Sequence, residues 1–261
     1  NAVVIGGGLL GLEAAYGLKQ RGMNVTVLHL MDRIMERQLD GRASRMLRQS
    51  IEEKGINIIT EANTEALIGK DGHVNQVRLK DGTVLDADLV VFAVGIRPNI
   101  TLAQSAGLRC NRGILVNDTM QTFDPSIYAV GECIEHRNQT FGLVEPLWGQ
   151  AFICATHLAE HGSLTFKSPT VPTQLKVSGV DVFSAGNFEP KEDYEDIILN
   201  DEKRHIYKRI IIQKDKVIGA VLFGDTEDGM WYAELIADQT PVSTFRNKLL
   251  FGKDFALKKA G

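Results

Sequence analysis

Residues 2–28, AVVIGGGLLGLEAAYGLKQRGMNVTVL, contain two short apolar runs separated by a glycine cluster and a helix-forming segment. The first run, residues 2–5, has the length and β-branched content of a buried parallel strand. Residues 12–20 are mostly helix formers, and residues 21–24 are typical of a helix stop. The second run, residues 25–28, predicts another strand. The stretch is therefore a complete strand–turn–helix–strand unit.

The glycines of this unit have the spacing G-x-G-x-x-G. Gly6 would permit a tight turn, Gly8 the close approach of a pyrophosphate, and Gly11 close packing of the helix on the strand. Free N–H groups at the helix start, together with the helix dipole, would hold the negative charge. The motif has the preceding strand and following helix that it requires. It predicts a dinucleotide site, the alternative being a glycine-rich turn that binds nothing.

The end of the second strand is less regular. An acid that binds the ribose diol is expected about 20 residues after the glycines. The chain has His29 there, followed by Asp32 and Arg33. Asp32 either binds the ribose or is a loop residue, and Arg33 either meets a 2′-phosphate or is solvated. The choice between NADH and NADPH therefore stays open.

Composition places the chain among ordinary globular proteins. It has 261 residues, of which 44% are hydrophobic and 24% charged, and its net charge is −4. This acidic balance, without any Lys/Arg run, argues against a nucleic-acid surface. Apolar stretches are of strand length, so no membrane span is expected, and no signal peptide is visible. Because residue 1 leads straight into a strand, we expect a piece of a longer protein.

Three cysteines, Cys110, Cys133 and Cys154, form no C-x-x-C and no metal-binding spacing. Such a set is typical of a reducing cytoplasm, with each thiol a small buried or partly buried side chain. A redox disulfide is therefore not expected. Cys133 has neighbours of interest, but a packing role is favoured over a chemical one.

The remaining elements fall into three segments. An antiparallel hairpin inserted between parallel strands closes the first segment near residue 97, and strands followed by helices indicate an α+β module after a linker with Pro169 and Pro172. Before the linker we expect helices at 40–53, 101–106 and 146–158, and strands at 56–59, 65–69, 73–79, 83–85, 89–94, 113–117 and 127–130. After it we expect strands at 174–177, 180–185, 194–199, 205–213 and 216–223, and helices at 228–237 and 244–250.

These motifs together resemble the FAD/NAD(P)-dependent pyridine nucleotide–disulfide oxidoreductase superfamily, and within it the branch of assimilatory NAD(P)H nitrite reductase large subunits. The resemblance covers nearly the whole chain. The residues that carry it are 6–15, 38–40, 95–98, 114–118, 124–133, 141–144, 176–182 and 206–209.

The resemblance implies a fold and a division of labour. The fold is α/β, a Rossmann-like three-layer NAD(P)/FAD-binding domain followed by a small α+β domain. Residues 1–97 would be the NAD(P)-binding unit, 98–165 the second half of the FAD domain, 170–252 the α+β domain and 253–261 a tail. Residues 128–132 match the motif whose acid binds the FAD ribityl chain. Most relatives have Asp there, whereas Glu132 agrees with the nitrite reductase branch; the alternative is an acid that caps the following turn.

Cofactor-binding residues follow from the glycine motif and the resemblance together, and no residue is expected to be catalytic or to bind a metal. They are Gly6, Gly8, Leu9, Leu10, Gly11, Glu13, His29, Asp32, Arg33, Val94, Gly95, Gly131, Glu132, Leu147 and Trp148. The other G-x-G-x-x-G of the superfamily, which holds the FAD pyrophosphate, is absent, as are cysteine clusters for iron–sulfur and siroheme centres. The chain is therefore expected to be a truncated piece that is inactive alone.

The implied function is electron transfer from NAD(P)H through FAD, then iron–sulfur and siroheme, to nitrite, giving ammonia in the cytoplasm. Partners would be a nucleotide and either the rest of the parent chain or a redox protein, but neither nucleic acid nor membrane; a homodimer is left open. One alternative is a related NADH-dependent ferredoxin or rubredoxin reductase, or an NADH oxidase. Another is a nucleotide-binding module without turnover.

Overall fold

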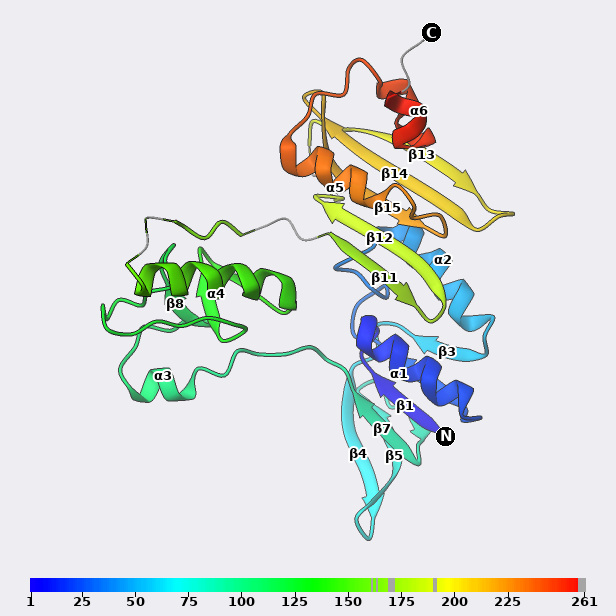
Figure 1. Cartoon of the computed structure of the whole chain (residues 1–261). Coiled ribbons are helices and arrows are strands. Elements are labelled where there is room, and N and C mark those ends of the chain that lie inside the picture. The colour runs from blue at the N-terminus through cyan, green and yellow to red at the C-terminus, as the bar shows by residue number, and fades with distance from the viewer. Residues whose placement is uncertain (161, 163, 169–171, 190–191, 258–261) are drawn as a thin grey trace. The chain divides into compact units, whose positions relative to one another are not determined.

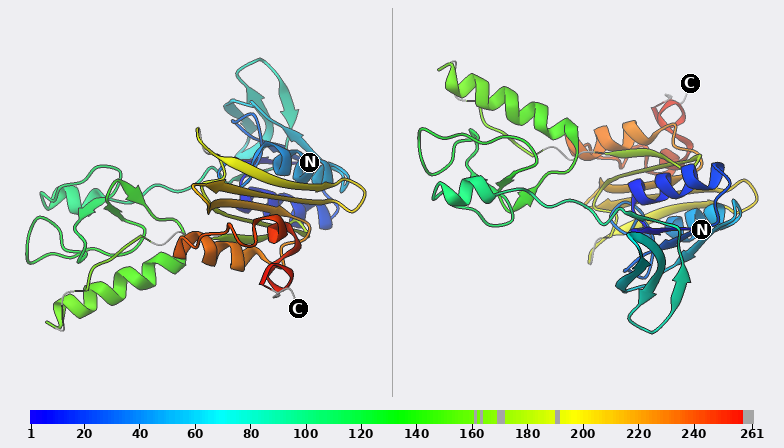
Figure 2. Two further views of the ribbon diagram at one scale, coloured as in Figure 1. Left: turned by 90° about the horizontal axis from the view of Figure 1, so that it is seen from above. Right: turned by 90° about the horizontal axis from the view of Figure 1, so that it is seen from below.

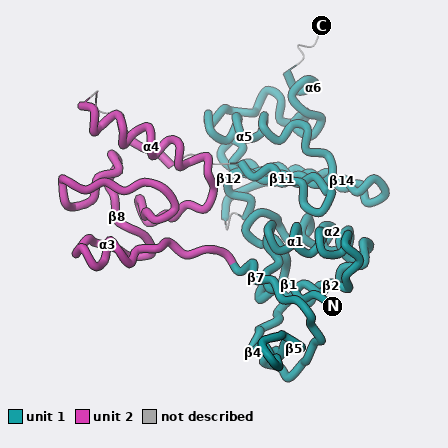
Figure 3. Tube along the Cα trace, turned by 60° about the horizontal axis from the view of Figure 1, so that its bottom comes forward, with its two compact units in different colours: residues 1–94, 172–261 teal, residues 95–171 magenta. Residues whose placement is uncertain are grey.

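The structure, a computed structural model, describes residues 1–160, 162, 164–168, 172–189 and 192–257. By its contacts the chain divides into two compact units (Figure 3). Unit 1 comprises Asn1–Val94 with Pro172–Gly261, and unit 2 comprises Gly95–Val171. The expected domain boundaries stay predictions, and the expected linker at Pro169 lies outside the described residues.

A parallel sheet forms the centre of unit 1 (Figure 1). Its strand order is β3-β2-β1-β7, and every neighbouring pair is parallel. Two amphipathic helices connect the first three strands on one face, and their apolar sides share a core with that face. The elements are β1 (Ala2–Ile5), α1 (Leu9–Gln20), β2 (Val25–Leu28), α2 (Gly41–Glu52), β3 (Ile56–Ile59) and β7 (Leu89–Phe92).

An antiparallel meander covers the opposite face of this sheet. It consists of β4 (Thr64–Lys70), β5 (His73–Leu79) and β6 (Val84–Asp86), inserted between β3 and β7. Val77 of the meander is buried with Val3 of the parallel sheet. Meander, parallel sheet and helices are the three layers of the expected Rossmann-like fold, and the inserted hairpin is confirmed.

The C-terminal module of unit 1 is a five-stranded antiparallel sheet of order β11-β12-β15-β14-β13. In Figure 2 the orange and red C-terminal helices lie on one side of this yellow sheet, and the blue α1 and α2 lie on the other. Both faces are therefore covered, and every residue of β14 and β15 is buried or half-buried. The elements are β11 (Thr173–Val177), β12 (Val180–Gly186), β13 (Glu195–Asp201), β14 (Ile206–Gln213), β15 (Lys216–Phe223), α5 (Gly229–Asp238), the 3-10 helix η1 (Arg246–Phe251) and α6 (Lys253–Leu257).

The helix expected at residues 244–250 is present as a 3-10 helix, η1, at Arg246–Phe251. One expectation for this module needs correction. The segment expected as a tail instead contains α6, because Ala256 is buried in the module's core.

Unit 2 is smaller and has a three-stranded sheet of order β10-β9-β8. Its elements are α3 (Thr101–Ser105), β8 (Ile114–Val116), β9 (Ile134–His136), β10 (Gln139–Thr140) and α4 (Val144–Leu158). The strand expected at 127–130 is wrong, because β9 takes the place beside β8. Tyr128 forms only an isolated bridge with Gln121. Among the described residues, no helix combines the length and apolarity needed to cross a bilayer.

Candidate functional site

The candidate nucleotide site lies where the parallel strands of unit 1 end. From β1 the chain proceeds to β2 and β3 on one side, whereas β7 pairs with β1 on the other. This reversal of strand order creates the crevice in which doubly wound sheets bind ligands, outside the carboxyl ends of the strands. The loop Gly6–Gly8 follows β1 directly at that edge.

Two glycines of the loop are required by close backbone contacts. Gly6 has a φ of +122°, and a Cβ there would lie 2.2 Å from the carbonyl oxygen of Ala93, just after β7. A Cβ on Gly11 would lie 1.9 Å from the carbonyl oxygen of Gly6. No side chain fits at either position, so the loop turns tightly and α1 packs directly against it.

Gly8 differs because the space around it is open. It is the N-cap residue of α1, and a Cβ there would meet no atom within 4 Å. Its carbonyl accepts the first helical bond, from the N–H of Leu12 at 3.0 Å. In the described part of the chain, the N–H groups of Leu9 and Leu10 have no acceptor, as expected in a first helical turn. The helix thus presents bare donors and its positive dipole end to an open space that can take an anion.

His29, expected to bind the cofactor from the end of β2, is buried and holds the glycine loop. The N–H of Gly7 donates to its Nδ1 at 2.9 Å. Since Nδ1 accepts a hydrogen bond, the ring proton is on Nε2, which lies 3.1 Å from Oε2 of Glu36 and donates to it. Both ring nitrogens are therefore engaged within the protein, so the structure places this residue behind the loop.

Asp32 and Arg33 have different surroundings. The Asp32 side chain is 69% exposed, so its carboxylate is available to a ribose hydroxyl. The Arg33 guanidinium contacts the C-terminal module, where Nη2 donates to Oε1 of Glu189 at 2.5 Å. Its Nη1 lies 4.0 Å from Oδ2 of Asp32. Arg33, for which contact with a 2′-phosphate and solvation were the alternatives, is thus paired within the protein.

Glu13 also contacts the C-terminal module. Its Oε1 accepts a hydrogen bond from the backbone N–H of Ser178 at 2.7 Å, and the Ser178 hydroxyl donates to the Leu12 carbonyl. These bonds join α1 to the turn between β11 and β12. Val94 and Gly95 follow β7 at the edge that carries the glycine loop; Val94 is exposed, and Gly95 has a φ of +89° with open space around it.

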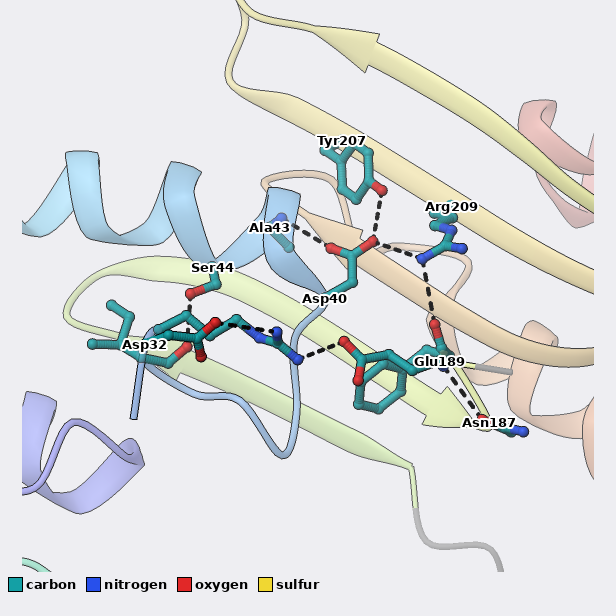
Figure 4. A network of polar contacts seen from close by, with 11 residues as sticks. Asp32, Asp40, Ala43, Ser44, Asn187, Glu189, Tyr207 and Arg209 are labelled. Carbon is teal, nitrogen blue, oxygen red and sulfur yellow. Dashed lines mark hydrogen bonds and ion pairs between the residues drawn. The ribbon is translucent and has the colours of Figure 1, made fainter. Parts of the chain in front are cut away.

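A buried polar network, drawn in Figure 4, joins α2 to β14. Asp40 is the N-cap of α2, and its Oδ1 accepts from the Ala43 N–H at 3.0 Å. Its Oδ2 accepts from the Tyr207 hydroxyl at 2.7 Å and from Nη1 of Arg209 at 3.2 Å. Asp196 accepts from Nε of the same arginine at 2.8 Å. The network therefore fixes the C-terminal module against the Rossmann helices.

Burial and the neighbouring carboxylates shift the pKa values of Tyr207 and Arg209, the two partners of Asp40. Burial and the hydrogen bond to Asp40 raise the pKa of the Tyr207 hydroxyl. For Arg209, burial acts to lower the pKa, but Asp196 and Asp40 outweigh it and the pKa is raised. The arginine therefore stays a cation and the tyrosine a neutral donor.

In unit 2, the residues expected to bind FAD surround the start of β9 and α4. Gly131 has a φ of +102°, and its N–H donates to Oε1 of Gln150 at 2.8 Å. Glu132 is exposed, and its carboxylate has no hydrogen-bond partner among the described residues, so it does not cap the turn. Nε2 of Gln150 is buried and also lacks a partner there. Leu147 is half-buried and Trp148 is 73% exposed. A free acceptor and a buried free donor fit a polyhydroxyl chain.

The cysteines do not provide a metal or disulfide site. All three are free thiols, and burial raises the pKa of Cys110 and of Cys154. No group of three or more His, Cys, Asp or Glu side chains placed to hold a metal ion occurs in the described residues. These residues therefore do not fit an iron–sulfur or siroheme centre.

Known proteins resemble the chain over both of its sequence halves. Residues 1–151 match the family model described as pyridine nucleotide-disulphide oxidoreductase, and residues 172–240 match the rubredoxin NAD+ reductase C-terminal domain. A nitrite reductase [NAD(P)H] of Bacillus subtilis is 50% identical over 93% of this chain and 30% of its own length. An assimilatory nitrate reductase electron transfer subunit of the same organism is 42% identical over 96% of this chain and 32% of its own length. The chain thus spans about a third of the length of these curated relatives.

Solved structures agree with this assignment. A NAD-dependent persulfide reductase from A. fulgidus is 29% identical with a TM-score of 0.83, covering 94% of this chain and 50% of its own. A FAD-dependent pyridine nucleotide-disulphide oxidoreductase from Desulfovibrio vulgaris is 29% identical with a TM-score of 0.80, covering 94% of this chain and 66% of its own. The matching family model, the parallel sheet and the glycine loop lead to one conclusion: the chain belongs to the pyridine nucleotide-disulphide oxidoreductase family.

Proposed function

We propose that the chain is the nucleotide-binding part of a flavin-dependent NAD(P)H oxidoreductase whose full-length form is a nitrite reductase large subunit. The observation that carries the proposal is the glycine loop, which leaves the first-turn amides of α1 facing open space at Gly8. The 50% identity to a nitrite reductase [NAD(P)H] supports the choice within the family.

The loop and its neighbours would bind and orient the nucleotide. Bare amides at Leu9 and Leu10 and the helix dipole hold the pyrophosphate, while Asp32 accepts from a ribose hydroxyl. His29 keeps the loop in place through the Gly7 N–H. The chain needs no acid–base residue, because hydride transfer is chemistry of the cofactors and the protein supplies position and electrostatics.

FAD, the implied cofactor, would be held in unit 2 by Glu132, Gly131 and the free amide of Gln150. When bound, the flavin supplies the two-electron chemistry that takes up the hydride of NAD(P)H. Further transfer through iron–sulfur and siroheme to nitrite, giving ammonia, requires centres carried elsewhere in the parent, because the cysteines here do not fit them. Three free thiols support a reducing cytoplasm as the compartment. We leave the homodimer open.

A second candidate is a reductase that passes electrons to a small redox protein. It is favoured by the match of residues 172–240 to the rubredoxin NAD+ reductase C-terminal domain. A rubredoxin-NAD(+) reductase of Pseudomonas putida is also 38% identical over 54% of this chain. Assaying the full-length protein with nitrite and with rubredoxin as acceptors separates the two.

Isothermal titration of NADH and NADPH into this chain tests the site. Wild type should bind at least one of them, and Gly8→Glu should weaken binding at least about tenfold, because the carboxylate occupies and repels the pyrophosphate position. Gly17→Glu is the matched control: it lies on the exposed side of the same helix, where a Cβ meets no atom within 4 Å. Equal affinity for the two variants would refute the site.

Flavin chemistry needs a second experiment. NADH added to the purified full-length protein should bleach the flavin absorbance; no bleaching would favour a nucleotide-binding module without turnover. The chain alone should bind nucleotide but leave gel filtration with less than stoichiometric FAD.

A further inference from the structure

We propose that Glu189 of the C-terminal module holds Arg33 away from the adenosine ribose, so that the site selects a dinucleotide without a 2′-phosphate. This inference rests on the proposed function, since it concerns the nucleotide preference of the same site. It assigns a specificity role to a residue 156 positions from its partner in the sequence.

The position of Arg33 makes it the cation to consider. In doubly wound sheets the adenosine ribose lies beyond the second strand, where an acid binds the 2′-hydroxyl or an arginine accommodates the 2′-phosphate. Arg33 follows β2 at that end and neighbours the exposed Asp32. An arginine free to turn toward the ribose would favour NADPH, since guanidinium binds phosphate through paired donors.

Arg33 is not free in this structure. Its Nη2 lies 2.5 Å from Oε1 of Glu189, and only 29% of its side chain is exposed. The pair joins the segment after β2 to the segment after β12. Two contacts fix the backbone that carries Glu189: its N–H donates to Oδ1 of Asn187 at 3.3 Å, and the carbonyl of Phe188 accepts from Arg209 at 3.4 Å. The glutamate is thus positioned by the same buried network that joins the two modules.

The charges around Arg33 favour a hydroxyl over a phosphate. The guanidinium lies between the carboxylates of Asp32 and Glu189, so the three groups together carry a net charge of −1. A 2′-phosphate would add roughly another −1.5 to −2 charges beside them. A 2′-hydroxyl, in contrast, finds a ready acceptor in Asp32.

The test is isothermal titration of NADH and NADPH into wild type and Glu189→Gln, which keeps the side-chain shape but removes its charge. Wild type should prefer NADH. The variant should shift the ratio of the two affinities toward NADPH by about fivefold, the size expected for a partly exposed charge pair. The double variant Arg33→Gln/Glu189→Gln should not show this shift in the affinity ratio, because the shift requires the arginine that Glu189→Gln releases.

Glu202→Gln is the matched control. It breaks a pair with Arg42 at 2.6 Å that also joins the C-terminal module to the Rossmann helices, but Arg42 lies in α2 and not after β2. The ratio should not change in this variant. A wild-type preference for NADPH, or an unchanged ratio in Glu189→Gln while NADH still binds, overturns the inference alone. Failure of wild type to bind either nucleotide overturns the proposed function and this inference with it.

Discussion

Unit 1 and unit 2, coloured separately in Figure 3, differ in how completely each buries its apolar side chains. In unit 1 the parallel sheet and the five-stranded sheet are each covered on both faces, and three hydrophobic clusters result. Unit 2 has one small cluster. Its helix α4 buries Ile153 and Cys154 on one side, while Val144, Trp148 and Phe152, spaced four residues apart, are all more than 60% exposed.

This difference in burial means that the expected nucleotide and FAD sites lie in units of different completeness. The glycine loop lies in a closed unit, held by backbone contacts and by His29, so its geometry exists before any ligand binds. The residues expected to contact FAD lie in a unit that leaves an apolar helix face uncovered, and such faces commonly mark interaction surfaces. We therefore expect the chain to bind nucleotide well and flavin poorly.

The largest effect should come from breaking the polar network of Asp40, Tyr207 and Arg209, which joins the C-terminal module to the Rossmann helices. Asp40→Ala removes an N-cap, leaves the buried Tyr207 hydroxyl without its acceptor and takes away one of the two carboxylates that pair with Arg209, which should lower the free energy of unfolding by about 3–5 kcal/mol. Urea unfolding in a Trp148→Phe background measures it, because Trp231, buried in α5, then reports on unit 1 alone.

Asp196→Asn in the same background is the control for this prediction. It removes a partner of Arg209 that is 31% exposed, while Asp40 remains in place. Its loss of stability should be clearly smaller. Equal losses for the two variants would mean that Asp40 does not join the modules.

Glycine packing should give the next largest effect. Gly11→Ala places a methyl group 1.9 Å from the Gly6 carbonyl oxygen, so the loop must shift, at a cost of about 3 kcal/mol and with loss of nucleotide binding. Gly17→Ala, in the same helix with open space around it, should instead stabilise by up to about 1 kcal/mol. Thermal unfolding with and without NADH measures both, and similar melting temperatures would show that the close contact is not rigid.

Loss of the hydrogen bond between His29 and the Gly7 N–H of the glycine loop should have a moderate effect. His29→Leu leaves the Gly7 N–H without an acceptor, at a cost of about 1–3 kcal/mol to loop stability. NADH affinity should fall accordingly in isothermal titration. His29→Asn, whose side-chain oxygen can take the place of Nδ1, should restore most of it. If His29→Leu binds NADH as tightly as wild type, the hydrogen bond from Gly7 to His29 is not needed for the loop's geometry.

The smallest effect concerns acid sensitivity of unit 2. Hydrogen bonds from Arg137 and His136 lower the pKa of Asp118 to about 2 from 3.8. Because the folded-state pKa is depressed, the contribution of Asp118 to stability is present above about pH 4 and is lost as the pH falls through 3.8 toward 2. Hydrogen exchange of β8 and β9, corrected for intrinsic rates, should show this loss in wild type but not in Asp118→Asn. Identical pH profiles would contradict it.

Local patterns anticipated most of the elements. The glycine motif lies between a strand and a helix, as its spacing predicts. The five antiparallel strands of the C-terminal module form close to their expected ranges. The strand expected at 127–130 is wrong because a short apolar run does not by itself show which segment will pair with a neighbouring strand; β9 pairs with β8 in its place. The hydrogen bond from the Gly7 N–H to His29 was not anticipated, because it joins residues 22 positions apart.

The sequence by itself determined that a strand, a glycine turn and a helix would expose backbone amides to an anion, because glycine spacing and apolar periodicity are local properties. Only the tertiary structure decided which side chains around that unit are paired across the two modules. Arg33 meets Glu189, Asp40 meets Tyr207, and Glu13 meets Ser178, all more than 150 residues apart. Such pairs leave no pattern in a single sequence, since they arise when two modules pack and their buried charges must find partners.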